Sequence, residues 1–264
     1  MAQKGDFEIS WDPEQYLRFA DERLQPAIDL LRRVDSTNPS VICDLGCGAG
    51  NVTRLLAARW PAARIVGVDS SAEMLSKARA VLPSVDWREA DMATFEPDVA
   101  PDLIFSNAAL HWMGDHPRLF GRLFALLAPG GELAVQMPRN FMAASHTGIA
   151  EAAADGPWRD VLAPHLHRAA VEAPELYWDL LRAAGAQATL WQTEYVHALH
   201  GTDPVVQWTM GTALRPLLAV LEEPWRSEFL ADYARRMAVA YPPRPDGTTL
   251  FPFRRLFILA RKAA

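Results

Sequence analysis

The chain has 264 residues, 50% of them hydrophobic, and its 26 lysines and arginines are outnumbered by 32 aspartates and glutamates, for a formal net charge of −6 at pH 7. This length and composition suit one α/β domain with a sizeable core, and the acidic balance disfavours partners with a phosphate backbone, so we expect no nucleic-acid partner. No apolar run reaches about 18 residues, so we also expect no membrane-spanning helix and no membrane partner.

The first residues and the cysteines indicate the compartment. The opening stretch, MAQKGDFEISWD, lacks the apolar segment of a secretory signal. The two cysteines, Cys43 and Cys47, lie in and beside a predicted strand end, where disulfide geometry is poor, and they are too few for a structural zinc. We therefore expect a cytoplasmic protein whose cysteines pack as small residues, although Cys47 could also lie near a cofactor.

The stretch Val41–Asn51, VICDLGCGAGN, predicts a strand, a glycine-rich loop and the start of a helix. Glycines at 46, 48 and 50 let the backbone turn sharply beneath a bulky ligand. The N-terminus of the next helix adds unpaired N–H groups and partial positive charge. Asp44, just before the first glycine, suits a cationic ligand with an amino acid group better than a pyrophosphate, which indicates S-adenosylmethionine.

The spacing of these glycines argues against a nicotinamide dehydrogenase. The dinucleotide fingerprint places its third glycine three residues after the second, and Asn51 occupies that position here. The pattern D-x-G-x-G-x-G, formed by Asp44, Gly46, Gly48 and Gly50, instead resembles the first motif of the class I methyltransferases.

A second predicted strand, Arg64–Asp69, also ends in an acid. Asp69 follows the glycine loop at the usual distance for an acid that binds ribose hydroxyls. The alternative is that Asp69 caps the helix starting near Ala72, but Ser70 and Ser71 can take that place.

Strands and helices alternate through the first half of the chain, which predicts parallel strands with crossover connections. The further predicted strands are Val85–Met92, Asp102–Asn107 and Glu132–Met137. The predicted helices are Val52–Arg59, Ala72–Val81 and Pro117–Leu127. Ligands of such sheets bind at the carboxyl ends of the strands, so Asn107, His111 and Trp112 are candidates for the reaction centre. An isolated histidine such as His111 is more often a satisfied polar residue.

The second half is less regular. Its predicted elements are a helix over Glu175–Ala184, a strand over Thr189–Leu199, a largely helical segment over Pro204–Tyr241 and a closing antiparallel strand over Arg254–Arg261. Two histidine pairs, at 165 and 167 and at 197 and 200, lack further ligands nearby, so we expect no metal.

Taken end to end, the chain resembles the trans-aconitate 2-methyltransferase family. The matching segments are W-D-P-x-x-Y-L-x-F at Trp11–Phe19, DLGCGAGN at Asp44–Asn51, RWPAARIVGVDSS at Arg59–Ser71, EADM at Glu89–Met92, DLIFSNAALHW at Asp102–Trp112, LAVQMP at Leu133–Pro138, W-x-x-x-T-x-L-R-P at Trp208–Pro216 and RLFILARK at Arg255–Lys262. The glycine loop is common to many methyltransferases, whereas the N-terminal aromatic set, VQMP and the late LRP are much narrower signals.

The resemblance implies a single class I methyltransferase domain over residues 1–264. It implies a Rossmann-like, doubly wound α/β fold with a seven-stranded sheet, an antiparallel last strand and an N-terminal helical cap over residues 1–36. Helical insertions at 139–173 and 201–244 would form a lid over the active site. It implies S-adenosylmethionine as cofactor, with Asp91 accepting a hydrogen bond from the adenine and Met92 packing on its ring. The expected cofactor residues are Asp44, Gly46, Cys47, Gly48, Gly50, Asn51, Asp69, Ser70, Asp91, Met92 and Asn107.

The implied acceptor is a small tricarboxylate, trans-aconitate, bound by a monomer or small homo-oligomer. A carboxylate is already ionised at pH 7, because its reference pKa is about 4, so its methylation needs no general base and we assign no catalytic residue. Two carboxylates would be anchored by charged and polar groups. The expected substrate residues are Trp11, Tyr16, His111, Trp112, Tyr195, His197, Arg215, Arg254 and Arg255, with Arg215 the first choice as anchor.

Two other functions stay open at this point. One is a methyltransferase of the same fold that acts on another small acid, a phenol or an amine. The other is a protein that binds S-adenosylmethionine without catalysis, as a regulator would. Turnover of labelled cofactor with a panel of acids separates all three.

Overall fold

The structure is a computed structural model that describes residues 20–166 and 171–264, so Trp11 and Tyr16 lie outside the described residues. The chain divides into two compact units. The sheet unit comprises Asp21–Arg139, Ala169–Glu194 and Arg254–Ala264. The helical unit includes Asn140–Arg168 and Tyr195–Phe253. No helix within the described ranges is both long and apolar enough to cross a membrane.

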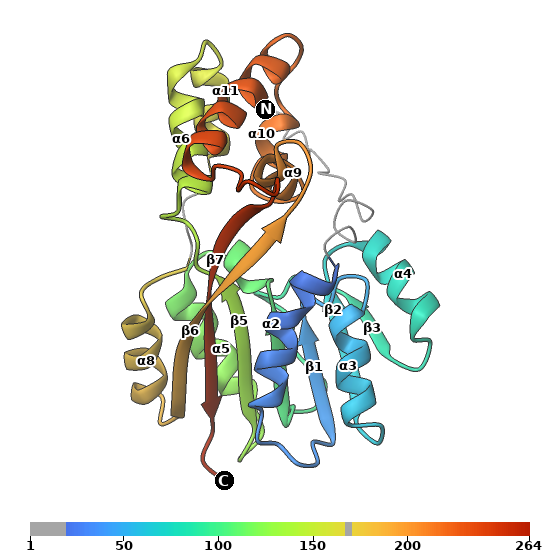
Figure 1. Ribbon diagram of the computed structural model, residues 1–264. Coiled ribbons are helices and arrows are strands. Elements are labelled where there is room, and N and C mark those ends of the chain that lie inside the picture. The colour runs from blue at the N-terminus through green and yellow to red at the C-terminus, as the bar shows by residue number, and fades with distance from the viewer. Residues whose placement is uncertain (1–19, 167–170) are drawn as a thin grey trace, which may run out of the picture. The chain divides into compact units, whose positions relative to one another are not determined.

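The sheet has seven strands in the order β3-β2-β1-β4-β5-β7-β6 (Figure 1). Their bounds are β1 Val41–Leu45, β2 Arg64–Asp69, β3 Asp86–Glu89, β4 Leu103–Asn107, β5 Glu132–Pro138, β6 Gln187–Leu199 and β7 Thr249–Arg261. Strands β1 to β5 pair in parallel, and β7 pairs antiparallel to β5. The predicted doubly wound α/β fold with an antiparallel last strand is confirmed.

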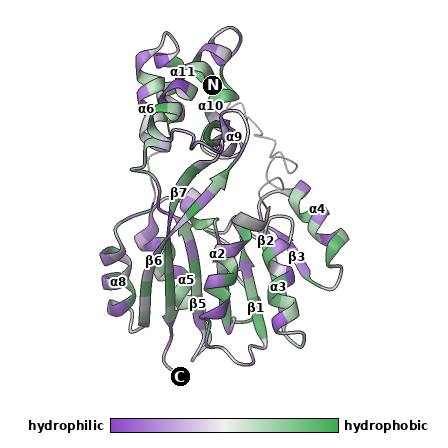
Figure 2. Ribbon diagram, in the orientation of Figure 1, coloured by the Kyte–Doolittle hydropathy of each residue, from purple (hydrophilic) through white to green (hydrophobic). Residues whose placement is uncertain are grey.

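The helices of the sheet unit follow the predicted crossovers. They are α2 Ala20–Arg32, α3 Asn51–Arg59, α4 Ala72–Val81, α5 His116–Leu126 and α8 Pro174–Ala183, with a short 3₁₀ turn, η1, at Leu110–Trp112. In Figure 1, α2 and α3 lie in front of the strands and α5 lies behind them. Central strands covered on both faces become continuously apolar. In β1 four of the five residues are apolar, the exception being Asp44, and most of the strand is coloured as hydrophobic in Figure 2. All residues of β1 after the first are buried.

The helical unit has a core of its own. Its helices are α6 Ala144–Asp155, α7 Arg159–Leu162, α9 Pro204–Met210, α10 Arg215–Leu218 and α11 Trp225–Ala240, with a 3₁₀ turn, η2, at Ala163–His165. Trp158 packs edge-on against Phe229 at 5.7 Å between ring centroids, and Tyr233 and Met237 of α11 are buried in the same cluster. The two predicted insertions are therefore helical, while their expected role as a lid stays a prediction.

Two strand boundaries differ from the predictions by more than two residues. The third strand was predicted over Val85–Met92, but β3 ends at Glu89 because the carboxylate of Asp91 accepts a hydrogen bond from the Ala93 N–H at 2.8 Å and closes a turn. The last strand was predicted from Arg254, but β7 begins at Thr249. Residues 249, 251 and 253 are buried in alternation, and this period of two continues the strand through Pro252.

Candidate active site

The loop after β1 holds its three glycines in left-handed backbone conformations. The φ angles are 74° at Gly46, 54° at Gly48 and 82° at Gly50. At Gly46 the side-chain space is also occupied, because an added Cβ would lie 2.1 Å from the Cβ of Ala109. The loop therefore lies directly against the segment that follows β4. Only glycine satisfies both the backbone angle and this close approach.

Asp69, the last residue of β2, fastens this loop to the sheet. Its Oδ2 accepts a hydrogen bond from the Gly48 N–H at 2.9 Å, and its Oδ1 accepts one from the Ser71 N–H at 2.9 Å. Helix α4 is capped by Ser71, whose hydroxyl accepts from the Met74 N–H, so the capping alternative for Asp69 is wrong. A carboxylate has about four lone-pair sites, so a ribose contact by Asp69 stays a prediction beside these two bonds.

Asp44 lies beneath the loop and is 1% exposed. The hydroxyl of Thr53, on α3, donates to its Oδ2 at 2.6 Å. Burial raises the pKa of the Asp44 carboxyl from 3.8 to about 7, against the opposite influence of the Thr53 hydrogen bond. Thr53 was not among the residues predicted from the sequence. Its signal would have been a polar residue in the first turn of the helix after the loop.

The remaining predicted cofactor residues surround the same strand ends. The Sδ of Met92 lies 3.1 Å from the position that a Cβ on Gly46 would take, so Met92 borders the loop. Cys47 is buried, its backbone N–H donates to the Val68 carbonyl at 3.1 Å, and burial raises the pKa of its thiol. Asn51 begins α3, and Asp91 holds the turn after β3. Ser70, between Asp69 and the cap of α4, completes the set.

The carboxyl end of β4 is followed by a strained turn. Ala108 has a φ of 52°, an angle that residues with a Cβ rarely adopt, and its N–H donates to the Gln136 carbonyl at 2.9 Å. The turn leads into η1, where the rings of His111 and Trp112 lie 4.7 Å apart. The predicted residues Asn107, His111 and Trp112 thus lie at the end of β4, next to the strand that carries the glycine loop.

Some of the predicted substrate residues belong to the sheet unit and others to the helical unit. In the sheet unit, Arg255 is 5% exposed, whereas Arg254 forms an exposed ion pair with Glu194 at 3.4 Å. In the helical unit, His197 is buried against Trp208, with 4.6 Å between ring centroids, and Tyr195 stacks with it at 6.4 Å. Arg215 begins α10 of that unit.

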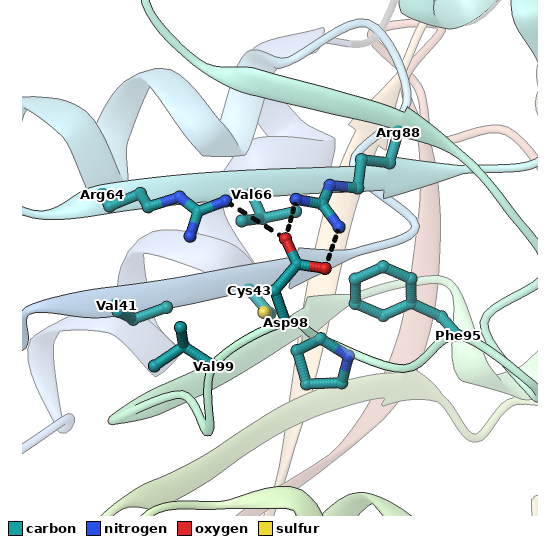
Figure 3. A pocket seen from close by; sticks show the side chains of 9 residues that line it. Val41, Cys43, Arg64, Val66, Arg88, Phe95, Asp98 and Val99 are labelled. Atoms are coloured by element: carbon teal, nitrogen blue, oxygen red, sulfur yellow. Dashed lines mark hydrogen bonds and ion pairs between the residues drawn. The ribbon is translucent and has the colours of Figure 1, made fainter.

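A small cavity in the sheet unit lies away from these strand ends (Figure 3). It is lined by Val41 and Arg64, the first residues of β1 and β2, and Cys43 forms part of its wall. Figure 3 shows Arg64 and Arg88 both directed at Asp98, which they pair with at 3.5 and 2.5 Å. The ion-paired side chains of Arg64, Arg88 and Asp98 line this cavity, which lies by the first residues of β1 and β2 and not at the carboxyl ends of the strands, so it is no part of the candidate site. In the part of the chain that the structure describes, no group of three or more histidines, cysteines and acids is arranged to hold a metal.

Known proteins resemble this chain in sequence over most of its length. A family model described as a methyltransferase domain matches residues 42–131, from β1 to the turn before β5. A trans-aconitate 2-methyltransferase of Azoarcus sp. (strain BH72) is 48% identical over 251 residues, which cover 95% of this chain and 98% of the relative. One of the same name from Methylobacterium radiotolerans is 46% identical over 96% of this chain and 99% of its own length.

The chain belongs to the trans-aconitate 2-methyltransferase family. It is therefore a methyltransferase. Solved structures support the fold at lower identity. The YcgJ protein of Bacillus subtilis is 11% identical with a TM-score of 0.61, over 92% of this chain and 99% of that one. The Haemonchus contortus phosphoethanolamine N-methyltransferase 2, in complex with S-adenosylhomocysteine, has a TM-score of 0.54 and 16% identity, over 91% of this chain and 53% of that one.

Proposed function

We propose that this protein is an S-adenosylmethionine-dependent methyltransferase that esterifies one carboxylate of trans-aconitate, giving the monomethyl ester and S-adenosylhomocysteine. The observation that carries the proposal is the near full-length similarity, at 48% identity, to a relative of that activity. The geometry of the strand ends supports it, because the loop after β1 is built for close contact with a ligand.

The residues around the glycine loop fit the cofactor. The positive-φ loop offers backbone to a large group, and the buried carboxyl of Asp44 supplies negative potential for the ammonium of its amino acid portion. Asp69, Asp91 and Met92 are the proposed contacts of the ribose and the adenine. The bound cofactor supplies a methyl group on a positively charged sulfur, which leaves by in-line displacement.

The work left to the protein is to bind, orient and exclude water. Alignment of the two reactants can supply a large share of the barrier reduction. The acceptor carboxylate is already ionised at pH 7, so no proton has to be removed from it. Arg215, Arg255 and Arg254 are the proposed partners of the carboxylates that are not methylated, since a guanidinium fork matches a carboxylate in two places.

Incubation with labelled S-adenosylmethionine and a panel of acids tests the proposal. We expect a monomethyl ester from trans-aconitate, and much less product from citrate, from simple phenols and from amines. Cofactor binding without turnover on any of them would favour a non-catalytic sensor, and efficient turnover of a phenol or an amine alone would replace the acceptor class.

Two glycine substitutions test whether the loop after β1 binds the cofactor. Gly46→Ala is expected to lose cofactor binding in calorimetry, because its new methyl would meet Ala109 at 2.1 Å and its φ is positive. Gly114→Ala, where an added Cβ meets nothing within 4 Å, is the matched control and keeps wild-type binding. Equal binding by both variants would argue against the loop as the cofactor site.

A further inference from the structure

Gln136 of β5 is a buried amide whose polar atoms are both unsatisfied. The residue is 0% exposed, and neither its Nε2 nor its Oε1 has a hydrogen-bond partner in the structure as described. Buried polar side chains almost always have such partners, and an exception calls for an explanation. Gln136 belongs to the family-matching segment LAVQMP, but it was not among the predicted site residues, although a glutamine inside the apolar strand Glu132–Pro138 is an unusual signal.

A second unsatisfied amide atom lies on the neighbouring strand. Asn107 is the register partner of Gln136 across β4 and β5, so the two side chains project from the same face of the sheet. The Oδ1 of Asn107 is buried and, among the described residues, also without a hydrogen-bond partner. Three unsatisfied amide atoms are thus gathered at the carboxyl ends of two adjacent strands, beside the strained turn at Ala108.

The order of the strands places this amide pair on one side of the cofactor loop and the proposed ribose and adenine contacts on the other. The glycine loop follows β1, Asn107 ends β4, and Gln136 lies on β5, and these three strands are consecutive in the sheet. Neighbouring strands are about 4.8 Å apart, so Gln136 lies about 10 Å across the sheet from β1. The proposed ribose contact, Asp69, ends β2, and the proposed adenine contact, Asp91, follows β3, both on the opposite side of β1.

The surroundings of Gln136 favour an anion. On its other flank, its register partner is Phe257 of β7, whose ring stacks on Trp191 at 4.7 Å and offers no hydrogen bond to an amide. Arg255 is two residues from Phe257 on the same strand, so it projects from the same face, and it is 5% exposed. A buried guanidinium and an amide NH₂ on one face suit a carboxylate better than a cation or an apolar group.

We propose that the Gln136 side-chain NH₂ donates a hydrogen bond to the carboxylate that is methylated and so orients it. This inference rests on the proposed function. A neutral amide can hold one carboxylate oxygen while leaving the negative charge of the other available for attack, whereas a bidentate guanidinium would engage both oxygens. The free-energy cost of burying this unsatisfied amide in the free protein is then offset by the hydrogen bond that forms when the acceptor binds.

Two substitutions separate an acceptor contact from a packing role. Gln136→Met keeps a similar length and removes the polar atoms, and Gln136→Glu keeps the shape but replaces the NH₂ donor with a carboxylate. Gln187→Met is the matched control, because Gln187 is exposed at the start of β6. The readouts are the unfolding temperature of each protein alone, with S-adenosylhomocysteine, and with S-adenosylhomocysteine plus trans-aconitate, followed by kcat/KM.

We expect Gln136→Met to unfold at or above the wild-type temperature and to keep its stabilisation by S-adenosylhomocysteine. We expect it to lose the added stabilisation by trans-aconitate and to lower kcat/KM about tenfold to a hundredfold, the range for one hydrogen bond to a charged group. Gln136→Glu should lose more, because like charges repel. Gln187→Met should behave as wild type.

Several outcomes overturn the inference. One is a lower unfolding temperature for Gln136→Met with trans-aconitate stabilisation retained, which would make Gln136 a structural residue. Another is wild-type protein that no carboxylic acid stabilises. Wild-type protein that trans-aconitate stabilises through Gln136 but that forms no ester would contradict the proposed function alone and leave the Gln136 contact supported.

Discussion

Burial changes the acid–base behaviour of Asp44, a residue of the glycine-loop motif. In the sequence it is an acid in front of a glycine loop, and that position already indicated a cationic ligand. The structure adds that the carboxyl is 1% exposed and bonded to Thr53 at 2.6 Å. Desolvation brings its pKa to about 7, so its charge changes within the physiological range.

Cofactor affinity is therefore expected to depend on pH. If a cationic cofactor favours the ionised form of Asp44, protonation below pH 7 opposes binding. We expect the dissociation constant of S-adenosylmethionine to be about tenfold higher at pH 6 than at pH 7.5, measured by calorimetry. Asp44→Asn should bind weakly at both pH values, while Asp179→Asn, an exposed site on α8, should keep the wild-type profile. A flat profile for the wild type would count against this role of Asp44.

The same group has a predictable effect on stability. The pKa of Asp44 is higher in the folded protein than in the unfolded chain, so between about pH 4 and 7 the folded protein holds a proton that the unfolded chain has lost. This contribution makes the free energy of unfolding fall as pH rises through that window, and the loss is complete above pH 7. Asp44→Asn is accordingly expected to raise the free energy of unfolding at pH 8, by at most about 4 kcal/mol for three pKa units.

For Asp69 the structure excludes one of two alternatives, the helix cap, and adds a contact that neither alternative included. Local spacing predicted either a contact with the ribose of a ligand or a cap on the helix that follows directly along the chain. The structure shows its carboxylate holding the Gly48 N–H, a contact across two strands. Sequence patterns of single elements do not encode such contacts, because they depend on how β1 and β2 pair.

At the scale of elements, periodicity predicted the sheet unit well. Helix α4 and strand β2 have the predicted bounds, and α3 and α5 each differ by one residue. The alternation of helices with apolar strands identifies a parallel sheet, since crossovers need a dozen or more residues. Boundaries were wrong where one side chain decides them, as at Asp91, or where a proline interrupts the pattern without ending the strand, as at Pro252.

One arginine connects two helices of the helical unit. Arg236 of α11 bonds Asp232 of its own helix at 2.8 Å, and reaches across to Glu151 at 3.2 Å and Asp155 at 2.6 Å on α6. Its side chain is 27% exposed, so the network is partly shielded from solvent. A cluster of several charges with good geometry contributes more than an isolated surface pair.

Removal of this arginine should weaken the pairing of α6 with α11. We expect Arg236→Ala to lower the free energy of unfolding by about 1 kcal/mol in denaturant titrations, with a smaller effect at 1 M salt because the charges are screened. Arg235→Ala is the control, since that side chain is 71% exposed and pairs with Asp232 on its own helix, and its effect should stay within about 0.5 kcal/mol. Equal effects would show that the network adds nothing.

At the scale of the whole molecule, a ligand of the sheet unit should stabilise the fold. S-adenosylhomocysteine at about 100 times its dissociation constant is expected to add about 2.7 kcal/mol to the free energy of unfolding. For a chain of this size, that corresponds to a rise of about 5 to 10 °C in the unfolding temperature. NADH at the same concentration is the control, and a comparable rise with NADH would revive the dehydrogenase interpretation that the glycine spacing disfavoured.

The amino-acid sequence by itself determined the order of the elements, the fold class, the glycine loop and the family, because these follow from periodicity and from short motifs. Tertiary structure alone decided which side chains meet across strands: Asp69 with the loop, Asp44 with Thr53, and Gln136 beside Asn107. The physical reason is that hydrogen-bond satisfaction and pKa depend on burial and on strand register. Both are properties of the packed sheet, and neighbouring residues along the chain do not specify them.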